Sequence, residues 1–266
     1  MAIRDLREFL KFLDTQGELL TIDKRVDPHL EIGAVGYLTR LDKAVLFTKV
    51  KGSDKTVAMN VLGTRKRIAL ALGTTEEGLT EKLSEGIANP IQPKLVSDGP
   101  CKENILKGKK VDLNIFPIPQ WNEKDGGRFI DFSNVITKDI ETGVQNAGMY
   151  RIHVKGKNKT SIYVADRQHI GRHYKKAKEG GRKTLEMAVV FGLEPVTNLM
   201  GPCPTEYGLN ELELAGGLRG EPVEVVKCET VDLVVPATAE IVLEGKIPIG
   251  VHETEGPFGE FTGYYS

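Results

Sequence analysis

The sequence predicts a mixed α/β (α+β) protein with two domains, a small N-terminal α/β domain over residues 1–115 and a second domain over residues 116–266. Helical and strand patterns alternate over about the first 100 residues, which is typical of a small α/β domain. A proline-rich stretch then interrupts the pattern. Many short strand patterns follow it, and they predict a mostly antiparallel, barrel-like or split-barrel sheet.

The N-terminal part is expected to contain helices and strands in alternation. E-I-G-A-V-G-Y-L-T-R-L predicts a helix, and K-A-V-L-F-T-K-V and T-V-A-M-N-V-L-G predict strands because they are rich in β-branched residues. Thr74 and Glu77 match a capping box that would open a further helix. The first helix is indicated by apolar residues on one helical face and a glycine that stops it: Ile3, Leu6, Phe9, Leu10, Leu13 and Gly17.

The stretch from residue 89 to about residue 129 is predicted to be an irregular connection, and the best place for a domain boundary. It contains the sequence D-G-G and the only tryptophan, Trp121. It also contains a run of prolines that would interrupt helices and central strands: Pro90, Pro93, Pro100, Pro117 and Pro119.

The second domain begins with a predicted meander of N-V-I-T-K-D-I, a strand starting at G-M-Y-R-I-H-V, and S-I-Y-V-A. A helix over H-I-G-R-H-Y-K-K-A-K is expected to end at Gly180 and Gly181. N-E-L-E-L-A-G-G-L predicts a short helix. The remaining predicted strands are L-E-M-A-V-V-F-G, P-V-E-V-V-K-C, V-D-L-V-V-P and A-E-I-V-L-E-G.

The overall composition is that of an ordinary globular protein, with 40% hydrophobic and 27% charged residues. The 36 basic and 37 acidic residues nearly cancel, which argues against nucleic-acid binding. No apolar run reaches membrane-spanning length and the first residues lack a signal-peptide core, so a cytoplasmic location is expected. Cys101, Cys203 and Cys228 are scattered, which disfavours a disulfide framework or a structural zinc site.

Several polar residues of the second domain are candidates for chemistry. Arg151 follows Asn146 and Gly148 in Q-N-A-G-M-Y-R. Gly148 would let the backbone approach a ligand closely. Arg151 reads either as a solvent-facing strand arginine or as a guanidinium that holds a carboxylate in two-point geometry.

A second set of candidates could bind a metal. His169 lies four residues before His173, and one of the two is a better candidate ligand than both. Glu211 stands at a predicted helix start, where an acid is also favoured by the helix dipole. A site built from Asn146, His169 and Glu211 would suit manganese or magnesium, with phosphate oxygens completing the shell.

The glutamates around G-P-F-G near residue 257 raise a question, since carboxylates packed closely repel one another. Glu253, Glu255 and Glu260 form either a solvated acidic turn or a site in which a cation holds the acids and one acid moves a proton. Cys203 is a poor candidate nucleophile, because prolines flank it and no histidine is paired with it in the sequence.

Taken together, these motifs resemble the UbiD family of decarboxylases, which includes 3-octaprenyl-4-hydroxybenzoate carboxy-lyases and ferulic acid decarboxylases. The resemblance is carried by N-A-G-M-Y-R, R-Q-H-I-G-R-H-Y, E-L-A-G-G-L-R-G, V-V-K-C-E-T-V-D-L-V-V-P-A-T-A-E-I-V-L-E-G and E-G-P-F-G-E-F-T-G-Y. It runs from about residue 146 to residue 264, and residues 1–100 resemble the family's N-terminal region less sharply.

The resemblance implies a prenylated flavin mononucleotide (prFMN) bound in a split-barrel-like domain, with its phosphate held through Mn²⁺ (or Mg²⁺) and with K⁺ nearby. It implies that Asn146, His169 and Glu211 are the metal ligands. The residues that it places along the flavin are Gly148, Met149, Arg151, Gln168, Gly201, Pro202, Cys203 and Pro204, although a small polar residue is common where Pro202 and Cys203 stand here.

The resemblance also implies that Arg151, Glu255 and Glu260 form a catalytic Glu-Arg-Glu network. Arg151 would keep Glu255 ionised, while an apolar substrate and a like charge would let Glu260 carry a proton. The implied reaction is a reversible, non-oxidative decarboxylation of an aromatic or α,β-unsaturated carboxylic acid through a covalent flavin adduct. Glu253 has no counterpart in the motif and is expected to be a surface acid.

Relatives continue beyond the point at which this sequence stops, so the resemblance implies a flavin domain that is incomplete at Ser266. A fragment, a partly described chain or a split subunit would each explain this. The expected partners are a small carboxylic acid, a flavin prenyltransferase that supplies the cofactor, and a second copy or a complementary C-terminal polypeptide. The alternative functions are a partial subunit that is inactive alone and a metal-dependent hydrolase.

Overall fold

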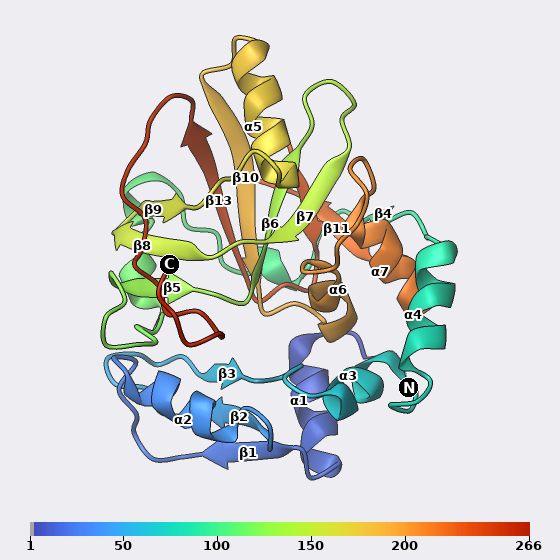
Figure 1. Cartoon of the computed structure of the whole chain (residues 1–266), viewed down its shortest axis with the longest axis vertical. Coiled ribbons are helices and arrows are strands. Elements are labelled where there is room, and N and C mark those ends of the chain that lie inside the picture. Colours follow the sequence, from blue (N-terminus) through green and yellow to red (C-terminus); the bar gives the residue numbers. More distant parts are fainter. Residues whose placement is uncertain (1–2) are drawn as a thin grey trace.

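The computed structural model describes residues 3–266 and has a mixed α/β fold, which confirms the predicted fold class. Figure 1 shows an N-terminal layer of helices and a small sheet packed beneath a larger, strand-rich part. The strands form four small sheets, and none of them closes into a barrel within the described residues. The second part is therefore an open arrangement of sheets.

The N-terminal layer is built on the sheet β1-β2-β3, in which β1 and β2 are parallel and β2 and β3 antiparallel. Helix α1 begins where the Asp5 side chain accepts a hydrogen bond from Glu8 N, and it buries Phe9 and Leu13. The elements of this layer are α1 (Leu6–Thr15), β1 (Leu19–Ile22), α2 (Glu31–Thr39), β2 (Ala44–Phe47), β3 (Val57–Met59) and α3 (Arg65–Leu72).

The largest sheet has the order β13-β10-β6-β7, and all of its neighbouring strands are antiparallel. Helix α5 (His169–Glu179) packs against it and contacts β6, β7 and β10 (Figure 1). The strands of this sheet are β6 (Ser133–Lys138), β7 (Gln145–Met149), β10 (Thr184–Phe191) and β13 (Ile241–Pro248).

Two further three-stranded sheets, β12-β11-β4 and β5-β8-β9, flank the largest one. Their strands are β4 (Lys94–Leu95), β5 (Arg128–Ile130), β8 (Ile152–Gly156), β9 (Lys159–Ile162), β11 (Glu224–Lys227) and β12 (Val234–Pro236). The remaining helices are α4 (Leu79–Ala88), α6 (Pro195–Met200) and α7 (Glu211–Arg219), with short 3₁₀ turns at Pro100–Lys102, Gly108–Lys110 and Leu113–Ile115.

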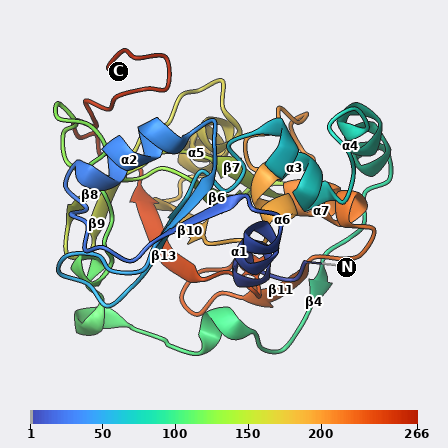
Figure 2. The same cartoon turned by 90° about the horizontal axis from the view of Figure 1, so that it is seen from below.

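The largest hydrophobic core joins the N-terminal helices to the strand-rich part. Leu72 of α3 and Leu79 of α4 belong to the same buried cluster as Ile136 of β6 and Val190 of β10. Figure 2 shows α3 and α4 beside α6 and α7. The division into domains at residue 115 stays a prediction. The largest core contains residues from both sides of that position.

Some predicted elements differ from the observed ones. The Thr74–Glu77 capping box is wrong, because α4 begins only after Gly78, and the Thr75 hydroxyl accepts from Gly78 N instead. Helices α3 and α6 were not predicted. The predicted strand beginning at G-M-Y-R-I-H-V is divided into the end of β7 and the whole of β8, which belong to different sheets.

Within residues 3–266, no helix has the length and apolar character that a membrane span requires.

Candidate active site

The division between β7 and β8 positions two groups of polar side chains. Asn146 lies in β7, which pairs with β6, whereas Arg151 stands just before β8, which pairs with β5. The chain therefore passes from one sheet to another between these two residues. Asn146 belongs to one candidate group and Arg151 to the other.

The first group brings together Asn146, His169 and Glu211, the three residues for which a metal-binding role was predicted. His169 is the first residue of α5 and Glu211 the first residue of α7. The Asn146 amide Nδ2 lies 2.7 Å from Glu211 Oε1 and 3.1 Å from His169 Nδ1. His169 Nδ1 lies 3.8 Å from Glu211 Oε1. Three side chains that are far apart in the sequence thus converge on one point.

The structure around Glu211 holds its carboxylate in place. Glu211 is buried, and Ala147 N donates to its Oε2 at 2.7 Å. The Thr205 hydroxyl donates to Oε1 at 2.8 Å. The position at the start of α7 also favours a negative charge through the helix dipole. A carboxylate fixed in this way can serve as a preorganised ligand.

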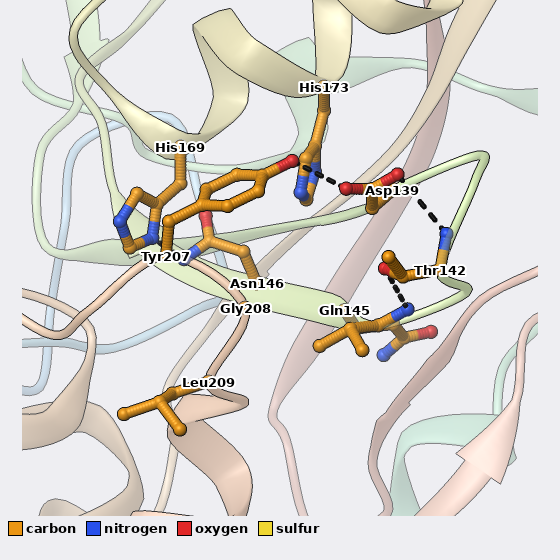
Figure 3. Close-up of a pocket in the computed structure, with 10 residues that line it drawn as sticks. Asp139, Thr142, Gln145, Asn146, His169, His173, Tyr207, Gly208 and Leu209 are labelled. Atoms are coloured by element: carbon orange, nitrogen blue, oxygen red, sulfur yellow. Dashed lines mark hydrogen bonds between the residues drawn. The ribbon is translucent and has the colours of Figure 1, made fainter.

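A small polar pocket lies beside this group (Figure 3), lined among others by Asp139, His169, His173 and Tyr207. The Tyr207 hydroxyl donates to Asp139 Oδ2 at 2.5 Å, and its ring meets the rings of both histidines edge to face. Burial lowers the pKa of His173 to about 4, and Thr137 Oγ1 lies 2.9 Å from its Nδ1. His173 is therefore neutral, and its ring is packed between Thr137 and Tyr207.

The donor set of the first group fits a divalent cation. The Asn146 amide now places its nitrogen between two acceptors, and half a turn of the amide would bring its oxygen there instead. A carboxylate, an imidazole and an amide oxygen would then converge, a mixture that suits Mn²⁺ or Mg²⁺. Within residues 3–266, no group of three or more His, Cys, Asp or Glu side chains could hold a metal ion. The candidate site therefore depends on the Asn146 amide oxygen as its third protein ligand.

The second group joins Arg151 to both glutamates for which a catalytic role was predicted. Arg151 Nε and Nη2 donate to Glu255 at 3.0 and 2.7 Å, a two-point geometry. Arg151 Nη1 donates to Glu260 Oε1 at 2.7 Å. The Glu255 side chain is 8% exposed and the Glu260 side chain 37% exposed. Glu255 is thus the enclosed partner and Glu260 the accessible one.

The charge of Arg151 is well supported in this group. Burial opposes a positive charge, but the hydrogen bonds and charges of Glu255 and Glu260 outweigh it and raise the pKa of Arg151. Its guanidinium carbon also lies 5.3 Å from the centre of the Phe258 ring. By contrast, Glu253 pairs with Lys159 away from Arg151, as expected for a surface acid.

Close backbone contacts bring the G-P-F-G loop to Arg151. Gly126 N donates to Pro257 O at 2.7 Å, and Gly259 N donates to Asp125 Oδ1 at 2.8 Å. A Cβ atom on Gly126 would lie 2.3 Å from Gly256 O, so only glycine permits this approach. The D-G-G motif thus anchors the loop that carries Glu255 and Glu260.

The residues predicted to line a flavin lie at the end of β7, just after it, at the start of α5 and in the loop of residues 201–204. Met149 N donates to Gly201 O at 3.1 Å, which joins the end of β7 to the loop of residues 201–204. The Gln168 side chain accepts from Ala165 N at the start of α5. Burial raises the pKa of Cys203, which disfavours a nucleophilic thiolate. Asn146 and His169, which lie close to Gly148 and Gln168 in the sequence, are seen together in Figure 3.

Several residues around these groups were not predicted. Thr205 and Tyr207 contact the first group, and Asp131 follows Ile130, whose strand partner Ile152 adjoins Arg151. Asp131 could have been noticed in R-F-I-D, where an acid directly follows a short strand pattern. The contacts of Thr205 and Tyr207 depend on loop packing, for which the sequence has no local signal.

Comparison with known proteins shows the family to which this chain belongs. Residues 94–266 match the UbiD family, described as the 3-octaprenyl-4-hydroxybenzoate carboxy-lyase Rift-related domain. Residues 10–87 match the N-terminal domain of the same family. The chain therefore belongs to the UbiD family, which confirms the resemblance seen in its motifs.

Individual relatives are similar along the whole of this chain. A phenolic acid decarboxylase from Bacillus subtilis is 37% identical over 283 residues, covering 100% of this chain and 59% of the relative. The structure of an evolved dimeric form of the UbiD-class enzyme HmfF from Pelotomaculum thermopropionicum, in complex with prFMN, matches with a TM-score of 0.95 at 40% identity, covering 99% of this chain and 62% of that one. The vanillic acid decarboxylase of Sedimentibacter hydroxybenzoicus, in closed form, matches with a TM-score of 0.94 at 36% identity, covering 99% of this chain and 59% of that one.

Proposed function

We propose that this chain carries the acid–base residues and the metal ligands of a UbiD-type carboxy-lyase, which removes CO₂ from an aromatic or α,β-unsaturated carboxylic acid. The observation that carries the proposal is the pairing of Arg151 with both Glu255 and Glu260 in a chain of this family. The relatives named as phenolic and vanillic acid decarboxylases support the same substrate class.

In this proposal the first group binds the phosphate of prFMN through a divalent metal. Asn146, His169 and Glu211 would hold Mn²⁺ or Mg²⁺, and K⁺ would lie nearby. The end of β7 and the loop of residues 201–204 would lie along the flavin, supported by their mutual hydrogen bond. The flavin-lining residues would be Gly148, Met149, Arg151, Gln168, Gly201, Pro202, Cys203 and Pro204. The prFMN-containing relative supports the choice of cofactor.

The second group would bind the substrate carboxylate region and move one proton. Arg151 holds Glu255 in two-point geometry, so Glu255 fixes the orientation of the guanidinium. Glu260 is the more accessible acid, and it would donate a proton to the carbon that loses CO₂. When bound, prFMN supplies an electron sink for the electron pair that departing CO₂ leaves behind. The reversible and covalent character of the reaction belongs to this proposal.

The assembly and location of the protein are also part of the proposal. We expect two domains over residues 1–115 and 116–266, a homo-oligomer in the cytoplasm, and prFMN supplied by a flavin prenyltransferase. Because the chain covers 59% of the length of the Bacillus relative, a second candidate is a cofactor-binding or partial subunit. Phe261, next to Glu260 in the chain, is fully exposed, and a complementary polypeptide would bury this apolar side chain.

The proposed function is tested by co-expressing the chain with a flavin prenyltransferase in manganese-containing medium. We expect the purified protein to show flavin absorbance and to release CO₂ from a cinnamic or hydroxybenzoic acid. Bound flavin without CO₂ release would favour the partial subunit. Protein with neither flavin nor activity would count against both candidates.

Two matched variants sharpen the experiment. Glu260→Gln should retain the flavin and lower CO₂ release at least about 100-fold, because it removes the proton donor. Glu253→Gln removes a nearby acid that pairs with Lys159, and it should leave both measurements unchanged. Loss of flavin in Glu260→Gln, or equal loss of activity in both variants, would contradict the role of Glu260.

A further inference from the structure

Tyr207 lies beside the proposed metal ligands and has no role in the function proposed above. It stands in the loop of residues 201–210, which joins α6 to α7. In this loop the Thr205 hydroxyl donates to Glu211 Oε1 at 2.8 Å. The Tyr207 ring packs edge to face with His169, with 5.4 Å between the ring centres. One loop therefore contacts two of the three proposed ligands.

The Tyr207 hydroxyl is anchored to a buried carboxylate outside its own loop. It donates to Asp139 Oδ2 at 2.5 Å (Figure 3). Asp139 is 2% exposed, and it accepts from Lys176 Nζ at 2.7 Å and from Glu141 N at 2.8 Å. Because Asp139 directly follows β6 and Lys176 lies in α5, the anchor ties Tyr207 to the largest sheet and to the helix that packs on it.

The Tyr207 ring is held by further contacts from α5. His173 meets the ring edge to face, with 5.8 Å between the ring centres. The guanidinium carbon of Arg172 lies 4.8 Å from the centre of the Tyr207 ring, and Lys176 Nζ lies 5.3 Å from it. Aromatic rings attract cations to their faces and other rings in edge-to-face pairs. Together with the hydroxyl anchor, these contacts restrict how the ring can turn.

The His169 imidazole has little support other than this ring. Within residues 3–266, its only hydrogen-bond partner is the Asn146 amide, whose Nδ2 lies 3.1 Å from Nδ1. In most metal sites the second nitrogen of a histidine ligand donates to a carboxylate or a carbonyl oxygen, which fixes the direction of the ring. The packing of Tyr207 against His169 is the contact that can take this place here.

We propose that Tyr207 is a positioning residue that holds the His169 imidazole with Nδ1 toward Glu211, so that the ring is oriented before a divalent cation binds. The inference rests on the proposed function for the identity of the metal ligands. A side chain that is ordered in advance loses less entropy when its ligand binds. Tyr207 thereby raises the affinity for the cation without touching it, and Asp139 keeps Tyr207 in place.

The affinity of the cofactor-free 266-residue chain for Mn²⁺, measured by isothermal titration, tests this role. Tyr207→Leu should weaken binding at least about tenfold, because the ring that supports the ligand is lost. Tyr207→Phe retains the ring without its anchor and should weaken binding only about two- to fivefold. Tyr37→Leu is the matched control, since Tyr37 is 65% exposed and also carries an arginine, Arg40, over its ring. Equal affinities for the unaltered chain and Tyr207→Leu would overturn the inference.

Pulsed electron paramagnetic resonance at saturating Mn²⁺ separates positioning from general destabilisation. The unaltered chain and Tyr207→Phe should show coupling of the ion to an imidazole nitrogen, which His169→Ala should abolish. Tyr207→Leu should lose most of this coupling, because His169 no longer points at the ion. A merely structural role would reduce the number of folded molecules and leave the coupling of each bound ion unchanged, so unchanged coupling in Tyr207→Leu would overturn the inference.

Proton NMR of the metal-free chain tests the orientation of the ring without relying on any ion. Nuclear Overhauser effects should join the His169 imidazole to the Tyr207 ring and to the Asn146 side-chain amide, and Tyr207→Leu should lose the second contact. Absence of either contact in the unaltered chain would overturn the inference. If both contacts appear but the unaltered chain binds no Mn²⁺, the proposed metal site fails and the orientation of His169 by Tyr207 stands. If Mn²⁺ binds through His169 equally well in Tyr207→Leu, only the role of Tyr207 fails.

Discussion

At the scale of single residues, Glu211 shows how a buried charge is stabilised before any ligand binds. Its carboxylate accepts from Ala147 N, from the Thr205 hydroxyl and from the Asn146 amide. These three hydrogen bonds stabilise the negative charge of the carboxylate, as a bound metal ion also would. A buried carboxylate without such partners would be costly, so these donors explain how Glu211 stays buried beside His169.

The corresponding prediction compares two glutamates in the first turn of α7. Glu211→Gln should weaken Mn²⁺ binding at least about tenfold, because a neutral amide replaces the anionic ligand. Glu213→Gln changes a half-buried acid in the same turn and should leave Mn²⁺ affinity unchanged. Isothermal titration of the cofactor-free chain with Mn²⁺ measures both, and equal weakening would show that Glu211 acts only through the helix dipole.

The sequence was sufficient to name both groups of residues but not all of their neighbours. Arg151, Glu255 and Glu260 could be named because they stand in motifs that resemble a known family. Asp131 could be noticed as an acid after a strand pattern, but its place next to Arg151 follows only from the pairing of β5 with β8. A register is set by strand pairing between distant segments, which local patterns do not determine.

At the scale of elements, α7 is positioned by close packing of its C-terminal end against α4. A Cβ atom on Gly217 would lie 2.2 Å from Gly86 O, and a Cβ on Gly86 would lie 2.4 Å from a methyl carbon of Leu218. The two helices can approach this closely only because both positions are glycine. Their contact holds α7, and with it Glu211, beside β7.

We therefore predict that Gly217→Ala lowers the free energy of unfolding by about 1–3 kcal/mol, because the helices must separate. Gly245→Ala in β13 is the matched control, since its Cβ would meet Met187 at an ordinary 3.9 Å. The control should change stability by less than about 1 kcal/mol. Urea unfolding of both variants measures this, and similar midpoints would contradict the role of the α4–α7 contact.

Most elements were predictable because their patterns are local. Helix α1 has its cap and its apolar face within a few residues, and α5 ends at glycines as expected. The division of β7 from β8 was not predictable, because Tyr150 and Arg151 continue an extended, alternating pattern. What separates the strands is the pairing of each with a different sheet.

At the scale of the whole molecule, the N-terminal layer and the strand-rich part share buried surface. Leu72 of α3 lies in the largest core cluster together with residues of β6, β10 and α7. Trp121, from the irregular connection, packs against the cluster around Ile32 and Phe47 in the N-terminal layer. The connection therefore contributes to the layer that precedes it, which composition alone could not indicate.

This sharing predicts that the described parts unfold together. Leu72 is 6% exposed, and Leu72→Ala should cost about 2–5 kcal/mol by leaving a cavity in the common core. Leu38→Ala, at a position that is 77% exposed, is the matched control and should change stability by less than about 0.5 kcal/mol. Urea unfolding followed by Trp121 fluorescence and by far-ultraviolet circular dichroism should give coincident transitions, both shifted to lower urea in Leu72→Ala. If only one of the two signals shifted, the N-terminal layer and the strand-rich part would be independent folding units, and the core that joins them would not govern stability.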